Sequence, residues 1–305
     1  MARTWASSGN PPNPTNPVVQ FLQAAIIGVS LGAQYALLAL GFTLIFGILG
    51  VVNFSHGGFY MLGGYVAYSC VAYLGLPYPL AVLAAVIAAG AVGWVFELFL
   101  LERLVDDHLA TLMLTLGLYL IMSTGMLTIF GPLSMEFTFP VTGALHLGPL
   151  YIPRENLIVL AICLAAVGAL WAVLFRTDLG RALRALADDR TVARAQGLSP
   201  KLLFPMAFAI ATGLAGLTGA LVTPILALSP GVGDPVLATS FLTVILGGLG
   251  SLEGAAMAAF VVGIVEAFSS VYFGGSIGAL VLFVLVLLLL VFRPTGLMGR
   301  TVRSA

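Results

Sequence analysis

The chain has 305 residues, of which 60% are hydrophobic and 8% are charged, and its mean hydropathy is +1.11. Soluble domains carry about 25% charged residues, so this chain has too few to cover a surface that faces water. Its formal net charge is zero, which gives no electrostatic reason to expect a nucleic-acid partner. We therefore expect a protein that resides in the lipid membrane.

Apolar windows of about 20 residues, the length that a helix needs to cross a bilayer, recur along the chain. They predict an all-α, polytopic transmembrane bundle of eight or nine spans, with breaks near residues 50 and 250. A transmembrane β-barrel would show short alternating segments, whereas residues 280–292 form a continuous apolar run. The windows lie at 18–47, 57–74, 79–101, 109–130, 156–175, 202–226, 236–249, 254–273 and 276–292.

The two ends of the chain differ from the apolar part between them. Residues 1–17 are polar and proline-rich, without the basic start and short apolar core of a signal peptide. We expect a flexible external tail there, a single transmembrane domain over 18–300, and a C-terminal tail at 301–305.

Basic residues predict the orientation, because short cytoplasmic loops are enriched in lysine and arginine. Ten of the twelve fall on one expected side: six within 176–201, three after residue 292, and Arg103. Arg3 and Arg154 fall on the other side. This distribution places the N-terminus outside and the C-terminus in the cytoplasm, which requires an odd number of passes and favours nine.

The longest expected external loop is residues 131–154. It contains two β-like runs, 135–141 and 144–152, separated by Thr142 and Gly143. Such a pattern predicts a small hairpin that turns at the threonine and glycine, and a hairpin there would be placed to meet an external partner.

The expected cytoplasmic loop, residues 176–203, carries helix start and stop signals. Asp188 or Asp189 can cap a short helix that runs to Gln196, and Gly197 supplies a left-handed residue after its end. A charged helix under the membrane suits a docking surface, but charged loops also simply sit in water. The helix signals alone favour both interpretations equally.

Four blocks of sequence, in order along most of the chain, carry a family resemblance: ILGVVNFSHGGFYMLGGYVAY (48–68), GRALRALADDRTVARAQGLSPKLL (180–203), VILGGLGSLEGAAMAAFVVGIVEAF (244–268) and LLLVFRPTGLMGR (288–300). They resemble the matching blocks of the branched-chain amino acid ABC importer permease family, of the LivH type. Glu253 stands where many members have proline, which leaves the solute open.

The resemblance implies a permease domain over 18–300 that works by alternating access in the cytoplasmic (inner) membrane of a bacterium or an archaeon. It also implies four partners: a second, related permease of the LivM type, two cytoplasmic ATPase subunits and an external solute-binding protein. Within the loop 176–203, the residues expected to couple the permease to the ATPases are Arg184, Ala187, Asp188, Asp189, Arg190 and Gly197.

We expect no nucleotide, metal or other cofactor in this chain. A P-loop needs GxxxxGK[ST], and the only lysine, Lys201, is preceded by proline and followed by leucine. The chain is therefore expected to be a transport subunit and not an enzyme, with ATP and Mg bound by the partner ATPases. The histidines, His56, His108 and His146, lie in different segments without cysteine or carboxylate at ligand spacing, so no metal site is expected.

A polar, glycine-rich stretch at 51–68 lies inside the apolar part of the chain. Broken backbone and polar side chains are costly in a membrane unless they line a cavity or are buried in protein. The residue types fit two interpretations equally well: a buried network whose polar groups only pair with one another, and a lining of the solute path. The family block at these residues favours the solute path. Glu97 is close enough to the inner end to reach water. The expected path residues are Gln34, Asn53, His56, Tyr60 and Glu266.

Two other functions fit parts of the sequence. GGSIG (274–278) matches the G-x-S-x-G motif of serine hydrolases, but no histidine follows His146, so we interpret the match as chance. The stronger alternative is an ion-coupled secondary transporter or channel for small solutes, because broken helices and a buried carboxylate also suit ion coupling. For an ABC importer the family implies branched-chain amino acids, with urea, amides and aromatic acids left open.

Overall fold

The computed structural model describes residues 16–105, 107–148, 150–293 and 295–298. The described chain is mostly helical, as the apolar windows predict, and six of its helices are long and apolar enough to cross a membrane. The prediction of a helical bundle with several membrane-spanning helices is thus confirmed. These six are α1 (Pro17–Leu49), α3 (Tyr78–Phe96) with its continuation η1 (Glu97–Leu101), α4 (His108–Phe130), α5 (Arg154–Arg176), α8 (Pro200–Leu226) and α10 (Leu252–Phe273).

The expected tails lie mostly outside the described residues, namely 1–15 and 301–305. Helix α1 begins at Pro17, the last residue of the expected N-terminal tail. The side chain of Asn16 accepts a hydrogen bond from the Val18 amide at 3.0 Å and caps the helix.

Three shorter helices occupy the remaining apolar windows: α2 (His56–Ala72), α9 (Gly233–Gly247) and α11 (Gly275–Phe292). With 17 and 15 residues, α2 and α9 are about 26 and 22 Å long at about 1.5 Å per residue. Both are shorter than the hydrocarbon core of a bilayer, which is about 30 Å thick.

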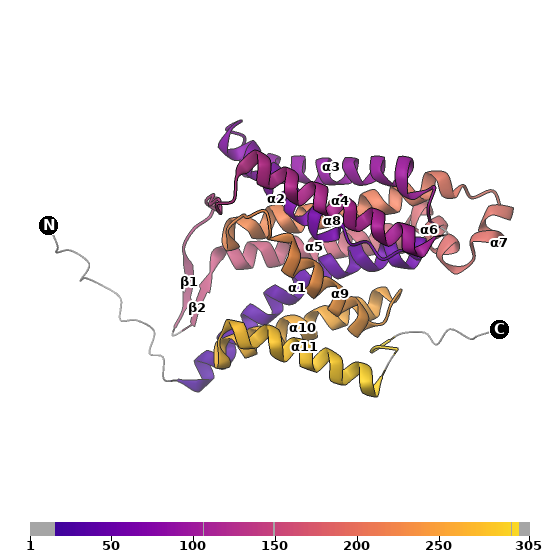
Figure 1. Ribbon diagram of the computed structural model, residues 1–305. Helices are drawn as coiled ribbons and strands as arrows, with labels where there is room; N and C mark the ends of the chain where they lie inside the picture. Colours follow the sequence, from indigo (N-terminus) through magenta and orange to yellow (C-terminus); the bar gives the residue numbers. More distant parts are fainter. Residues whose placement is uncertain (1–15, 106, 149, 294, 299–305) are drawn as a thin grey trace.

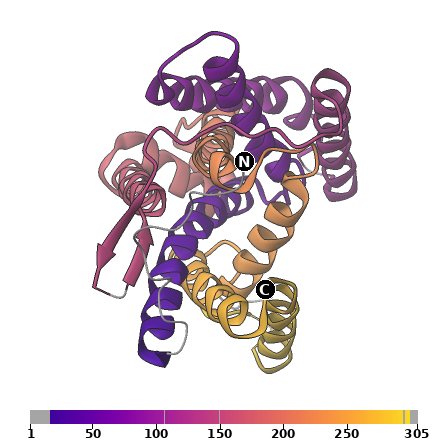
Figure 2. The same cartoon turned by 90° about the vertical axis from the view of Figure 1, so that its left-hand side faces the viewer.

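Helix α1 runs through the middle of the bundle, and Figures 1 and 2 show it between the other helices. It packs against α5, α8, α9 and α10, and most of its C-terminal two thirds is buried. A helix that is apolar on every side is stable only when it is enclosed by protein or lipid, which explains its central position. Helix α4, in contrast, has few buried residues and lies at the edge of the bundle.

Glycines allow the closest helix contacts. Gly63 of α2 lies directly against the backbone of Gly216 of α8, and Gly32 of α1 lies against Phe260 of α10. Small residues are common at such crossings in membrane bundles because they let two backbones approach each other.

The two ends of the bundle carry different elements (Figure 1). At one end, near the C-terminus, lie the short helices α6 (Asp178–Asp188) and α7 (Arg190–Ala195). At the other end, near the start of α1, lies a hairpin of β1 (Ala144–Leu147) and β2 (Leu150–Pro153). The segments predicted to be cytoplasmic and external thus lie at opposite ends.

The hairpin exists, but the predicted turn is wrong. The strands pair antiparallel from Ala144 with Pro153 to Leu147 with Leu150, so the turn includes Gly148 and not the threonine and glycine at 142–143. Gly148 has φ +62°, a left-handed conformation that glycine adopts without strain. The first β-like run instead contributes Met135, which forms an isolated bridge with Leu228 after α8.

Candidate functional site

The short helices α2 and α9 meet head to head inside the bundle. The backbones of Gly57 and Gly233, each at the start of its helix, are in direct contact, and a Cβ atom at either glycine would overlap the carbonyl of the other. From this junction α2 runs toward the hairpin end, where Tyr68 packs on Phe137 with ring centroids 5.7 Å apart. Helix α9 runs the other way, and its end accepts a hydrogen bond from the Leu297 amide near the C-terminus.

The junction lies near the middle of the membrane. Tyr119 is the central residue of the 23-residue helix α4 and its hydroxyl donates a hydrogen bond to Asp234 in the first turn of α9. The middle of such a helix is about 17 Å from either end at about 1.5 Å per residue, and half of the hydrocarbon core is about 15 Å thick. Two helix N-termini therefore converge near the bilayer centre.

A buried polar network holds the start of α2. The side chain of Asn53 accepts hydrogen bonds from the amide of Ser55 at 3.0 Å and from its hydroxyl at 2.5 Å. The His56 Nε2 donates to the carbonyl of Leu38 in α1 at 3.1 Å. Among the described residues, the Asn53 Nδ2 and the His56 Nδ1 have no hydrogen-bond partner, although both side chains are fully buried. The network thus pairs some of its groups and leaves two unused.

The other predicted path residues lie in different surroundings. Tyr60 is buried one turn after His56, and its backbone packs against Gly219 of α8. Glu266 of α10 accepts a hydrogen bond from the Tyr35 hydroxyl of α1 at 2.8 Å, and Gln34 is the residue before this tyrosine. The predicted residues therefore come from the start of α2 and from α1 and α10, and Tyr35 lies close enough to Tyr60 to interact with it electrostatically.

Glu97 does not reach water, which corrects the prediction from its position near the inner end. It starts the π-helical segment η1, its side chain is fully buried, and among the described residues neither carboxylate oxygen has a hydrogen-bond partner. Helix α3 and the segment η1 that continues it both pack against α8. A π-turn inside a membrane helix often marks a functional position.

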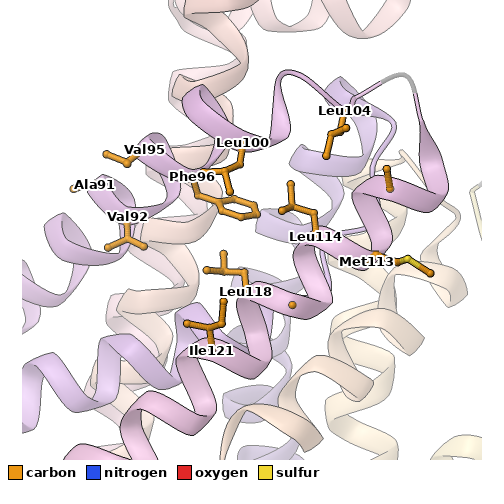
Figure 3. Close-up of a pocket in the computed structure, with 12 residues that line it drawn as sticks. Ala91, Val92, Val95, Phe96, Leu100, Leu104, Met113, Leu114, Leu118 and Ile121 are labelled. Carbon is orange, nitrogen blue, oxygen red and sulfur yellow. The ribbon is translucent and has the colours of Figure 1, made fainter.

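An apolar groove of about 880 Å³ separates α3 from α4 (Figure 3). Its lining includes Val95, Phe96, Leu114, Leu118 and Ile121, and none of its side chains carries a hydrogen-bonding group. Sites for polar solutes contain a few well-placed polar groups that fix orientation. The groove therefore does not fit a charged solute, and it contains none of the predicted path residues.

At the end with α6 and α7, the structure has the predicted capping. The Asp189 side chain accepts hydrogen bonds from the amides of Thr191 at 2.7 Å and Val192 at 3.0 Å, and Gly197 has φ +87°. Between them, α7 ends at Ala195, one residue before the predicted end at Gln196. Ala187, Asp188 and Asp189 are exposed at the corner between α6 and α7, the outermost part of this end.

Two of the predicted coupling residues point into the protein. A guanidinium nitrogen of Arg190 donates to the Leu49 carbonyl at 2.5 Å and the Ile48 carbonyl at 3.3 Å, in the last turn of α1. A cation at a helix C-terminus interacts favourably with the free carbonyls there. The Arg184 guanidinium lies 4.7 Å from the ring centroid of Phe175 in α5. Arg190 thus connects the exposed corner directly to the central helix.

The family described as "Branched-chain amino acid transport system / permease component" matches residues 24–292, which include every element described above except the first residues of α1. The chain belongs to this family. The permease is 29% identical to the high-affinity branched-chain amino acid transport system permease protein BraD of Pseudomonas aeruginosa, over 93% of this chain and 97% of the relative. It is equally similar, at 29%, to LivH of Escherichia coli K12, over 92% and 96%.

The permease is also 28% identical to LivM of Escherichia coli K12, over 88% of this chain and 68% of that protein. No solved structure matches the permease at a significant level. These similarities confirm that the chain is a permease component of a branched-chain amino acid ABC transport system family, as its four sequence blocks predict.

Sequence reasoning missed Tyr35, Tyr119 and Asp234. Tyr35 and Tyr119 lie within apolar windows, where an aromatic residue is normally only core. Asp234 precedes the window 236–249 by two residues and follows a glycine- and proline-rich stretch, which is typical of a loop at the membrane surface. Nothing local indicates that this stretch enters the bundle, because its position depends on contacts with α2 and α4.

Proposed function

We propose that this permease is the membrane subunit of an ATP-driven importer for branched-chain amino acids or similar small solutes. The proposal is supported by the family match over most of the chain and by the printed functions of BraD and LivH. The permease itself has no nucleotide site in this proposal, and ATP and Mg are bound by two separate ATPase subunits. A LivM-type permease and an external solute-binding protein complete the complex.

One observation carries the coupling mechanism: Arg190 ties α7 to the last turn of α1. Because α1 also packs against α9 and α10, a displacement of α7 would reach the helices beside the junction. We propose that ATPase closure acts on the exposed corner and moves α1 and its neighbours between outward-open and inward-open states. The residues that take part are Arg184, Ala187, Asp188, Asp189, Arg190 and Gly197.

The proposed arrangement in the membrane has nine passes, counting the shorter helices α2, α9 and α11. The N-terminus and the hairpin lie outside, and α6, α7 and the C-terminus lie in the cytoplasm. The positive-inside pattern supports this orientation, since most basic residues lie at the α6–α7 end. The membrane is the cytoplasmic membrane of a bacterium or an archaeon.

The proposed solute path passes the polar residues at the start of α2 and those of α1 and α10. Asn53, His56 and Tyr60 contribute from α2, and Gln34 and Glu266 contribute from α1 and α10. The unused Nδ2 of Asn53 and Nδ1 of His56 support the proposal, because unpaired buried polar groups are rare unless they serve a ligand or water.

Uptake of labelled leucine into proteoliposomes that contain the whole complex tests the function. We expect uptake that requires ATP and that is lost, together with ATPase binding, when helix breakers are placed in the 187–197 segment. Labelled urea and an aromatic acid measure the solute preference. Uptake that continues without ATP and follows a proton or sodium gradient would contradict the proposal and favour an ion-coupled transporter.

A further inference from the structure

Asp234 is an exposed carboxylate near the middle of the membrane. It lies in the first turn of α9, beside the central residue of α4, and its side chain is exposed in the isolated chain. A charged side chain at the bilayer centre costs about 2.5–3.5 kcal/mol or more when it faces lipid. The surface that carries Asp234 therefore faces water or protein in the assembled complex.

The contacts of Asp234 keep its carboxylate in place without neutralising it. One oxygen accepts a hydrogen bond from the Tyr119 hydroxyl, which ties α9 to α4. In the part of the chain that the structure describes, no lysine, arginine or histidine forms an ion pair with this aspartate. An acidic residue in the first turn also suits the positive end of α9, but that role needs no tyrosine from another helix.

The surroundings of Asp234 combine charge, polar backbone and aliphatic surface. The start of α2 touches the start of α9 one residue before the aspartate, so the first turns of two helices lie close to it. On α4, Leu116 and Leu120 are 46% and 55% exposed, within one turn of Tyr119. Broken helices that meet near the bilayer midplane are where transporters place their solute sites.

We propose that Asp234, held by Tyr119, lines the solute path and binds the ammonium group of an amino acid. This inference rests on the proposed function and assigns a residue to one end of its solute. The carboxylate and the ammonium form a charge-assisted hydrogen bond, while the exposed leucines of α4 contact the aliphatic side chain. The helix amides at the junction favour the solute carboxylate. The site accordingly prefers zwitterionic amino acids to uncharged amides and to carboxylic acids without an amino group.

The test compares two solutes in proteoliposomes that contain the complete complex. Leucine carries the ammonium group, and 4-methylpentanoate is the same molecule without it. For Asp234→Asn, we expect kcat/KM for leucine uptake to fall about tenfold to a hundredfold, the loss typical of a hydrogen bond between charged groups. The preference for leucine over 4-methylpentanoate should fall by the same factor. Tyr119→Phe, which keeps the charge but removes its support, should lower the preference less.

Glu97→Gln is the control, because it changes another carboxylate of a membrane helix into an amide, and the Glu97 side chain is fully buried whereas Asp234 is exposed. It should leave the solute preference unchanged. An Asp234→Asn complex with unchanged preference, or with equal losses for both solutes, overturns the inference while the wild-type complex still shows ATP-driven leucine uptake. Loss of the second permease on purification of this variant also overturns it, since Asp234 would then pair with a basic residue of that subunit.

Uptake by the wild-type complex alone tests the proposed function separately from the role of Asp234. Uptake that does not depend on ATP removes the importer mechanism but leaves the solute preference of the Asp234 variant measurable. A wild-type complex that takes up urea or amides but no solute with an ammonium group contradicts both the inference and the amino-acid assignment.

Discussion

At the scale of single residues, the permease keeps three carboxylates at membrane depth in three different ways. Glu266 accepts a hydrogen bond from a tyrosine of another helix, Asp234 does the same but is exposed, and Glu97 is enclosed. A carboxylate without a partner is strongly disfavoured in a buried site when it is charged. Glu266 and Asp234 each have a hydrogen-bond donor, whereas Glu97 has none among the described residues.

The pair of Tyr35 and Glu266 should hold α1 to α10. Tyr35→Phe removes the donor at 2.8 Å from the carboxylate and should lower the stability of the complex by about 1–3 kcal/mol. Thermal unfolding in detergent measures this as a lower melting temperature. In a double-mutant cycle, Tyr35→Phe combined with Glu266→Gln should cost less than the sum of the single changes. Additive costs would show that the hydrogen bond does not connect the two helices.

At the scale of elements, the junction of α2 and α9 depends on two glycines whose backbones touch. Gly57→Ala places a Cβ atom on the carbonyl of Gly233, so α2 and α9 must move apart. Overpacking of this kind costs about 1–3 kcal/mol or more. We expect less folded complex in the membrane and a lower melting temperature, measured by fluorescence-detected size-exclusion chromatography.

Gly125→Ala is the control for this change. Gly125 lies in α4, and apart from the adjacent backbone of α4 no atom of the described residues is within 4 Å of the position that its Cβ would occupy. Replacement of a glycine inside a helix by alanine stabilises the helix by about 0.5–1 kcal/mol when there is room. Equal behaviour of the two alanine variants would mean that the junction is looser than the contact of Gly57 with Gly233 indicates.

Arg190 should transmit movement from α7 to α1. Arg190→Ala removes both hydrogen bonds to the last turn of α1, so ATP hydrolysis should continue while leucine uptake per ATP falls severalfold. Hydrolysis and uptake are measured in the same proteoliposomes. Arg181→Ala removes an exposed ion pair with Asp178, which is worth about 0–1 kcal/mol, and should leave the ratio unchanged. An unchanged ratio in both variants would exclude Arg190 from coupling.

The sequence predicts those features that depend on local signals. The cap at Asp189 and the left-handed Gly197 follow from neighbouring residues, so both are present. The contact of Gly57 with Gly233 joins residues that are far apart in the chain, and no short-range pattern indicates it. The burial of Glu97 was missed for the same reason, because distance from a helix end says nothing about which helix covers the side chain.

At the scale of the whole molecule, the hairpin and the α6–α7 corner are separated by the full length of the helix bundle. The hairpin lies at one end and the exposed corner of α6 and α7 at the other, while the head-to-head helices lie between them (Figure 1). In the proposed importer, a signal from an ATPase would therefore travel along helices to reach the junction. The long central α1 is the continuous element that extends from the corner to the opposite end.

The proposed orientation can be tested with single cysteines. The native Cys70 and Cys163 are buried, so they should react slowly with a membrane-impermeant maleimide. On intact cells, Leu133→Cys, at a position that is 78% exposed after α4, should be labelled. Asp188→Cys should be labelled only after the cells are permeabilised. The opposite pattern would invert the topology and place α7 away from any cytoplasmic ATPase.

Residues 297–298, which follow α11, form hydrogen bonds that hold the end of α9 in position. The amides of Leu297 and Met298 donate to the carbonyls of Leu246 and Gly247 at 2.8 and 3.0 Å, which satisfies the last turn of that helix. The C-terminal end of α9 is therefore held by hydrogen bonds to the segment that follows α11. Any tilt of α9 must therefore either carry residues 297–298 along or break these two hydrogen bonds, so the residues that follow α11 in the chain restrain a helix that begins near the centre of the bilayer.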